Sequence, residues 1–152
     1  MPPSRPFRLL HVEDDDDHHE LLRLALQAAG PHVELARART GQEAIGCLGA
    51  SSPFEGGLAP DLVVLDLRIP APNGHEVLDV VKRDPRLRRI PVVVLSSSAG
   101  TGDIQQALDR AANAYVVKPT TAEEFERFAT ELRAFWEGWH EPDPDRDVDA
   151  LA

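Results

Sequence analysis

The sequence has few of the features on which secreted and membrane proteins depend. It contains one cysteine among 152 residues, so no disulfide can form within the chain. No apolar run approaches the roughly 18 residues that cross a membrane, and the N-terminal residues lack the apolar segment of a signal peptide. These absences exclude a disulfide-stabilised extracellular scaffold and predict a cytoplasmic protein.

Positive charge is also scarce. The chain has 16 Lys and Arg against 26 Asp and Glu, a formal net charge of -10. Residues 13–20 hold six acids and no Lys or Arg, and residues 141–152 hold five acids and one Arg, so these two segments carry the whole net charge. An acidic chain is not attracted to nucleic acid phosphates or anionic membranes, and we expect neither as a direct partner.

The length and composition indicate one domain. With 152 residues, 42% of them hydrophobic, the chain can build a core of its own, and we expect this domain over residues 7–138. Residues 1–6 are predicted to be an N-terminal tail. Residues 139–152, rich in Asp and Pro, are predicted to be an acidic, disordered tail.

Strand and helix patterns alternate along the chain. Five apolar runs are typical of strands: residues 7–12, 32–36, 61–65, 91–95 and 114–117. Thr40, Asn73 and Thr121 each precede a helical pattern and are followed three positions later by a Glu, as in a helix-capping box. This order predicts a doubly wound α/β fold, with parallel strands and helices on both faces of the sheet.

Two helical segments carry informative apolar stripes. In the first, we expect Leu21, Leu24, Ala25 and Ala28 to face the core. The last helical segment, residues 121–138 with the residues just after it, carries Phe125, Phe128, Ala129, Leu132, Phe135, Trp136 and Trp139. We interpret the first four as core. The last three lie beyond the expected edge of the sheet and are predicted to form an interface, most simply in a homodimer.

Chemically reactive side chains follow four of the expected strands. Glu13 and Asp14 come after the first strand, Asp66 after the third, Ser96 at the end of the fourth and Lys118 after the fifth. In doubly wound folds these strand ends share one edge, where ligands bind. Two carboxylates about 4 Å apart repel by roughly 4 kcal/mol at an effective dielectric near 20 unless a proton or cation lies between them.

A divalent cation would relieve this repulsion. Mg²⁺ takes six oxygen ligands at about 2.0–2.1 Å and often shares them with a phosphate. Asp66 is then a candidate nucleophile for a phosphoryl group, with Lys118 neutralising the charge on the transferred oxygens.

Over residues 7–138 the chain resembles the receiver domain of two-component response regulators. The resemblance rests on these motifs: Val12-Glu13-Asp14, Leu65-Asp66-Leu67 with Pro70 and Asn73-Gly74, Leu95-Ser96, and Tyr115-Val116-Val117-Lys118-Pro119. It implies a flavodoxin-like (βα)5 sandwich whose five-stranded parallel sheet has the order 2-1-3-4-5.

The resemblance also implies a metal site and a phosphoacceptor. Asp66 would accept a phosphoryl group from a histidine of a sensor kinase. Glu13, Asp14, Asp66 and the backbone carbonyl of Arg68 would hold Mg²⁺. No enzymatic activity is implied beyond self-catalysed phosphoryl acceptance and autodephosphorylation.

A switch is implied by the same family. The Ser96 hydroxyl would move onto the phosphoryl oxygens, Lys118 would pair with them, and Tyr115 would turn inward. The bond before Pro119 would be cis, which would aim Lys118. The chain looks most like the stand-alone regulators that are partnered with bacterial phytochrome histidine kinases.

Other functions remain as alternatives. An Asp-nucleophile phosphatase typically has a second acid two residues after the nucleophile, where this chain has Arg68. A flavin-binding protein would place a Ser, Thr or Gly-rich phosphate loop, not acids, after the first strand. His18 and His19 are neighbours on a helix and point about 100° apart, which disfavours a shared zinc ion. A scaffold of the same fold that is never phosphorylated is also possible.

Overall fold

Five parallel strands form one sheet in the order β2-β1-β3-β4-β5. The computed structural model describes residues 6–30, 33–97 and 100–137 of the chain. The strands are β1 (Phe7–Val12), β2 (Val33–Ala38), β3 (Leu62–Leu65), β4 (Val92–Ser96) and β5 (Ala114–Val117). The predicted strand order is therefore confirmed, and each strand lies within two residues of its predicted bounds.

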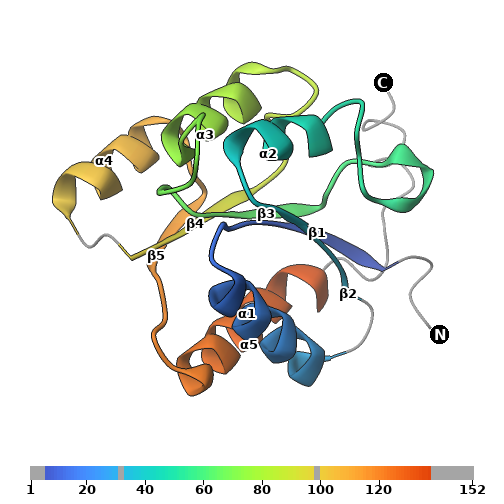
Figure 1. The fold of residues 1–152 in the computed structure, drawn as a ribbon, viewed down its shortest axis with the longest axis vertical. Coiled ribbons are helices and arrows are strands. Elements are labelled where there is room, and N and C mark those ends of the chain that lie inside the picture. Colours follow the sequence, from blue (N-terminus) through green and yellow to red (C-terminus); the bar gives the residue numbers. More distant parts are fainter. Residues whose placement is uncertain (1–5, 31–32, 98–99, 138–152) are drawn as a thin grey trace.

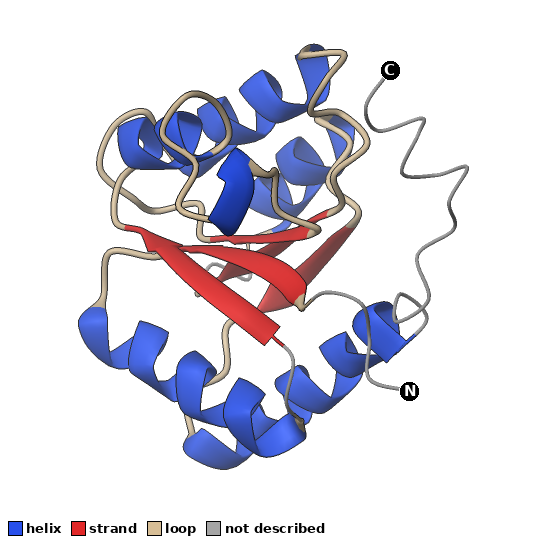
Figure 2. Cartoon of the chain, turned by 90° about the vertical axis from the view of Figure 1, so that its right-hand side faces the viewer, coloured by secondary structure: helices blue, strands red, loops and turns tan. Residues whose placement is uncertain are grey.

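Helices cover both faces of this sheet. They are α1 (Asp16–Ala29), α2 (Gly41–Cys47), α3 (Gly74–Arg83), α4 (Thr101–Asp109) and α5 (Ala122–Glu137), with a short 3-10 helix, η1 (Glu55–Gly57). In Figure 1, α2, α3 and α4 lie on one side of the sheet and α1 and α5 on the other, and Figure 2 shows the same two helical layers edge-on. The doubly wound fold is confirmed.

The core has two halves because both faces of the sheet are covered. Leu10 and Val12 of β1 point into the half beneath α2, α3 and α4, whereas Phe7 and Leu9 point into the half beneath α1 and α5. All four residues of β3 are buried, which explains why its sequence is continuously apolar and does not alternate.

The predicted helix caps are present. The side chains of Thr40, Asn73 and Thr121 each accept a hydrogen bond from the backbone N–H three residues on, at 3.0–3.1 Å. At Asn73 the capping box is complete, because Glu76 also accepts from the Asn73 N–H. These local signals place the starts of α2, α3 and α5.

The predicted buried face of α1 is wrong by about one position. Leu22, Ala25 and Leu26 are buried in the structure, whereas Leu24 is 49% exposed. Apolar residues are so dense in this helix that their spacing fits more than one face. Packing against α5, the neighbouring helix on the same side of the sheet, selects the face that is buried.

The last helix agrees with the prediction where it is described. Phe125, Phe128, Ala129 and Leu132 are buried against the sheet. The side chains of Phe135 and Trp136 in α5, and the whole of Trp139, lie outside the described residues. Residues 1–5 and 139–152 of the predicted tails lie outside them as well. The interface and the dimer therefore stay predictions. None of the helices in the described ranges is long and apolar enough to span a membrane.

Candidate functional site

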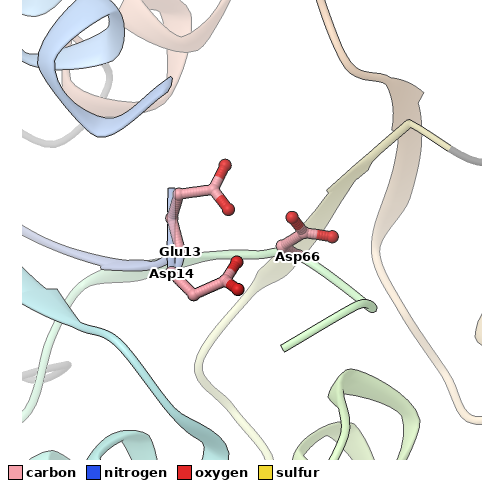
Figure 3. Close-up of side chains that lie close together, drawn as sticks. All are labelled: Glu13, Asp14 and Asp66. Atoms are coloured by element: carbon pink, nitrogen blue, oxygen red, sulfur yellow. The ribbon is translucent and has the colours of Figure 1, made fainter. Parts of the chain in front are cut away.

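Three carboxylates lie together where β1 and β3 end. The Asp66 N–H donates to Val12 O at 3.0 Å and the Glu13 N–H donates to Ala38 O at 2.9 Å, so the sheet ladder fixes both backbones. Glu13 and Asp66 are buried, at 1% and 5% exposure, whereas Asp14 is exposed. Figure 3 shows the Glu13 and Asp14 carboxylates extending from the end of β1 toward Asp66.

This cluster has the composition of a site for a hard cation. One carboxylate oxygen from each of Glu13, Asp14 and Asp66 lies within 4.8 Å of the other two. Two oxygens on one Mg²⁺ are at most about 4.2 Å apart, given bond lengths of about 2.0–2.1 Å, so small side-chain movements bring all three into range. The structure brings together the three predicted acidic ligands.

Lys118, the residue that follows β5, lies against this cluster. Its Nζ donates to Glu13 Oε1 at 2.5 Å and to Asp66 Oδ2 at 2.7 Å, and the side chain is buried. Burial acts to lower the pKa of Lys118, but the contacts with Asp66 and Glu13 together outweigh it and raise that pKa. The ammonium is therefore held in its charged form between the two carboxylates.

The surroundings of Glu13 disfavour its charged form. Burial, followed by its contact with the Asp66 carboxylate, raises the pKa of Glu13 to about 7, against the opposing effect of Lys118. Its second oxygen, Oε2, is buried and has no hydrogen-bond partner among the described residues. A buried carboxylate oxygen without a donor is costly, and a cation is one group that would satisfy it.

The loop after β3 holds Asp66 in place. The Arg68 N–H donates to Asp66 Oδ1 at 3.0 Å, and the Gly74 N–H donates to Leu67 O at 3.0 Å. A Cβ at Gly74 would lie 2.5 Å from Asp66 O and 2.4 Å from Leu67 Cα, so only glycine allows α3 to begin this close to the strand end.

The predicted switch residues lie on neighbouring strands. Ser96 is the last residue of β4 and is fully buried, and its carbonyl accepts from the Lys118 N–H at 2.8 Å. Tyr115 in β5 is partly buried and packs against the half of the core beneath α2, α3 and α4. Ser96 thus lies on the same edge of the sheet as the carboxylates.

The prediction of a cis bond before Pro119 is wrong. Among the described residues the cis peptide bond is Ala71–Pro72, and Lys118–Pro119 is not cis. Lys118 nevertheless reaches both Glu13 and Asp66, so its direction is fixed by these two ion pairs and by burial of its side chain.

Two residues of the site were not predicted. His18 lies in the first turn of α1 with its Nδ1 3.2 Å from Lys118 Nζ. Arg37, near the end of β2, donates from Nε to Glu13 O at 3.0 Å and from Nη1 to Asp16 Oδ1 at 2.7 Å. Arg37 is near the end of the strand beside β1, and this position could have indicated that it lies close to Glu13. For His18 the sequence offered none, since Lys118 is 100 residues away.

Buried carboxylates beside an ammonium can bind a divalent cation and stabilise charge on a phosphoryl group. Comparisons with known proteins show the family of the chain. Residues 9–130 match the family described as the response regulator receiver domain. The chain is 39% identical over 137 residues to the probable methanogenesis regulatory protein FilR2 of Methanothrix harundinacea, covering 89% of this chain and 86% of that protein.

Solved structures with the same fold include regulators from phytochrome systems. The phosphorylated cyanobacterial phytochrome response regulator RcpA has a TM-score of 0.79 and 33% identity, covering 87% of this chain and 94% of that chain. The Mn²⁺-bound form of response regulator Rcp1 has a TM-score of 0.77 and 31% identity, covering 86% and 94%. Because the family match spans residues 9–130 and such relatives cover most of both chains, the protein belongs to the response regulator receiver domain family.

Proposed function

We propose that the chain is a response regulator in which Asp66 accepts a phosphoryl group from a sensor histidine kinase. The observation that carries this proposal is the position of the Asp66 carboxylate. It is buried at the end of β3, beside Glu13 and Asp14, with Lys118 Nζ 2.7 Å from its Oδ2. In the reaction, an Asp66 oxygen attacks phosphorus, the P–N bond to the kinase imidazole breaks, and the released imidazole nitrogen keeps the bond's electron pair.

The residues of this chain prepare Asp66 for that attack. Lys118 keeps a positive charge at the carboxylate, where the transferred oxygens would arrive, and the Arg68 N–H fixes the direction of Oδ1. Burial keeps most water away from the acyl phosphate that forms. Ser96, on the adjacent strand end, is the hydroxyl proposed to move onto the phosphoryl group, and Tyr115 is the aromatic residue proposed to follow it inward.

The acids fit Mg²⁺ as the required cation. Glu13, Asp14 and Asp66 supply carboxylate oxygens, and we assign the Arg68 carbonyl as a further ligand. The unpartnered Oε2 of Glu13 supports the assignment, as does the Mn²⁺-bound form of the related Rcp1. When bound, Mg²⁺ would neutralise the charge that develops on the phosphoryl oxygens. A bound cation would compete with Lys118 for Glu13, which would leave the ammonium able to turn toward the phosphoryl group.

The proposed partner is a histidine kinase of the bacterial phytochrome type. The support is the similarity to RcpA, a phytochrome response regulator whose structure is of the phosphorylated form. We further propose a cytoplasmic location and a homodimer through the last helix, with Phe135, Trp136 and Trp139 at the interface. Phosphoryl transfer and autodephosphorylation are the proposed chemistry, and no turnover of external substrates is included.

An Asp-nucleophile phosphatase is not favoured. Such an enzyme needs an acid to protonate the leaving group, and two residues after Asp66 the chain has Arg68, whose side chain is exposed. A scaffold that is never phosphorylated would not need Lys118, Glu13 and Asp66 buried together, an arrangement that is expensive to keep without a function.

Beryllofluoride, a mimic of the phosphoryl group, provides the test. We expect a bound ¹⁹F resonance in the presence of Mg²⁺, with changes in the signals of Tyr115 and Ser96. Asp66→Asn should abolish the bound resonance, and the control Asp17→Asn, which removes an exposed acid nearby, should keep it. A resonance that survives in Asp66→Asn would contradict the proposal, and multiple turnover of a phosphate ester by the wild type would favour the phosphatase.

A further inference from the structure

We propose that His18 is a positioning residue for Lys118, a role that rests on the proposed function of Asp66 as phosphoacceptor. The neutral imidazole accepts a hydrogen bond from the Lys118 ammonium at Nδ1. This contact keeps the ammonium directed at Asp66 while Glu13 exchanges its partner for a cation.

The hydrogen-bonding capacity of Lys118 is the first argument. An ammonium has three N–H donors and no acceptor. Among the described residues, Nζ lies 2.5 Å from Glu13 Oε1, 2.7 Å from Asp66 Oδ2 and 3.2 Å from His18 Nδ1. The three contacts account for all three donors of a buried ammonium. His18 is the one member of the set that is not a carboxylate.

The position of His18 is fixed from two sides. Its backbone N–H donates to Oδ1 of Asp15, the N-cap of α1, at 3.0 Å. Its ring lies beside Phe125 of α5, with 6.4 Å between ring centroids, and Phe125 is buried. The helix cap thus anchors the backbone, while Phe125 limits how far the ring can turn. The side chain is 36% exposed, so substitution there should not empty the core.

The geometry also specifies the tautomer. Lys118 can only donate, so a hydrogen bond between Nζ and Nδ1 requires that Nδ1 carry no proton and that the ring proton be on Nε2. In the competing arrangements Nδ1–H would donate to Glu13 Oε1, 3.5 Å away, or to Asp15 Oδ2, 3.8 Å away. These distances are at or beyond the limit for a hydrogen bond, and Oε1 already accepts from Lys118.

His18 has a specific use during phosphorylation. Both carboxylate partners of Lys118 change roles in the proposed reaction, because Glu13 turns to a cation and Asp66 gains a phosphoryl group. His18 takes part in neither change, so its Nδ1 can accept a hydrogen bond from the ammonium throughout the reaction. Without it, Lys118 loses one of the three contacts that orient it, and fewer encounters with a phosphodonor are productive.

Three variants separate this role from a general effect on α1. His18→Leu removes the acceptor, and His18→Asn keeps a short side chain whose amide oxygen can replace Nδ1. Gln27→Leu introduces the same leucine at an exposed position of the same helix. With a small phosphodonor and Mg²⁺, we expect His18→Leu to be phosphorylated about three- to tenfold more slowly, the loss expected for one hydrogen bond. His18→Asn should stay within about twofold of the wild type, as should Gln27→Leu.

Nitrogen NMR on the unphosphorylated protein at mildly alkaline pH tests the contact itself. We expect an Nε2–H tautomer for His18 and a Lys118 ammonium resonance that shifts in His18→Leu and not in Gln27→Leu. A proton on Nδ1, an unchanged rate in His18→Leu, or a rate in His18→Asn as low as in His18→Leu would overturn the proposal. If the wild type is not phosphorylated at all, the proposed function fails, and the tautomer and ammonium signals still decide whether the contact exists.

Discussion

At Lys118 a single side chain offsets part of the negative charge of the site. Its ammonium lies between the buried carboxylates of Glu13 and Asp66, and both ion pairs are nearly closed to water. Removing one partner of a buried ion pair leaves the opposite charge unpaired, which destabilises proteins by about 3–5 kcal/mol. The loss is smaller where the remaining acid can take up a proton, and Glu13, whose pKa is already raised to about 7, can do so.

We therefore predict that Lys118→Met lowers the free energy of unfolding by about 2 kcal/mol at neutral pH without divalent cations. Mg²⁺ should restore part of this loss, because the cation would neutralise the same carboxylates. Urea unfolding with and without Mg²⁺ measures both effects. Arg83→Met, which removes an exposed cation on α3, should change stability by less than about 0.5 kcal/mol. Equal stability of Lys118→Met and the wild type would show that the ion pairs contribute nothing.

The shared location of the five predicted site residues could be inferred from the sequence, but the contacts between them could not. Ser96 ends β4, and Glu13, Asp14, Asp66 and Lys118 follow the ends of other strands, so the topology alone places all five at one edge. Which carboxylate Lys118 contacts depends on side-chain packing between residues more than 50 positions apart. No periodic pattern in the sequence indicates such a contact.

At the scale of elements, the start of α3 determines the position of Asp66. Asn73 caps the helix, and Gly74 then passes so close to the strand end that a Cβ would meet the backbone of Asp66 and Leu67. Backbone atoms cannot move aside as a flexible side chain can, so the helix or the loop after β3 must shift instead.

Substitutions at two helical glycines test this constraint. We predict that Gly74→Ala lowers the free energy of unfolding by about 3 kcal/mol and weakens beryllofluoride binding, since Asp66 is displaced. Gly102 of α4 has no atom within 4 Å of the position of a Cβ. Gly102→Ala should therefore leave binding unchanged and raise stability by about 0.5–1 kcal/mol. Denaturant unfolding and ¹⁹F titration of both variants provide the comparison, and equal effects would contradict the close approach at Gly74.

Elements were predictable where local signals specify them. The caps at Thr40, Asn73 and Thr121 needed only residues three positions apart, and the structure confirms all three. The buried face of α1 was predicted wrongly, with Leu24 facing inward, because tertiary packing and not spacing selects among its many apolar residues.

The stability of the whole molecule should depend on pH through His11. This residue of β1 is buried, and its Nδ1 is 3.0 Å from Nδ1 of His19, with the two rings stacked. Burial, with the nearby His19 and Lys118, lowers the pKa of His11 well below its ordinary value of 6.5. The folded state therefore resists protonation that the unfolded state accepts.

The sign of the effect follows from linkage. Above about pH 6.5 His11 is neutral in both states; as pH falls below that value the unfolded state binds the proton first, so stability is lost by up to about 1.4 kcal/mol per pH unit. Glu13, with its raised pKa, acts in the opposite direction between pH 4.5 and about 7, where stability falls as pH rises.

The variant His11→Phe isolates the histidine contribution, because Glu13 is kept in both proteins. We predict that the difference in unfolding free energy between wild type and variant changes as pH is lowered from about 7 to about 5, with the wild type losing more. His19, whose pKa is also lowered by burial, should be measured in a parallel variant, His19→Asn. A difference that does not vary with pH would contradict a neutral, buried His11.

The fold of the whole molecule was the most predictable feature. Continuous apolar runs such as residues 62–65 occur in sheets covered on both faces, and strand–helix alternation permits few topologies. The segment between α2 and β3 is mostly exposed, yet Phe54 within it is buried in the core. A single aromatic residue in a loop gives no periodic signal, so the burial of Phe54 could be found only from the structure.

The central claim is that Asp66 is the phosphoacceptor, and mass spectrometry of the intact protein tests it most directly. After incubation with acetyl phosphate and Mg²⁺, we predict one phosphoryl group per chain, mapped to Asp66, absent without Mg²⁺ and absent in Asp66→Asn. Asp17→Asn should be labelled like the wild type. Labelling that persists in Asp66→Asn, or a folded wild-type protein that binds Mg²⁺ and is never labelled, would contradict the account.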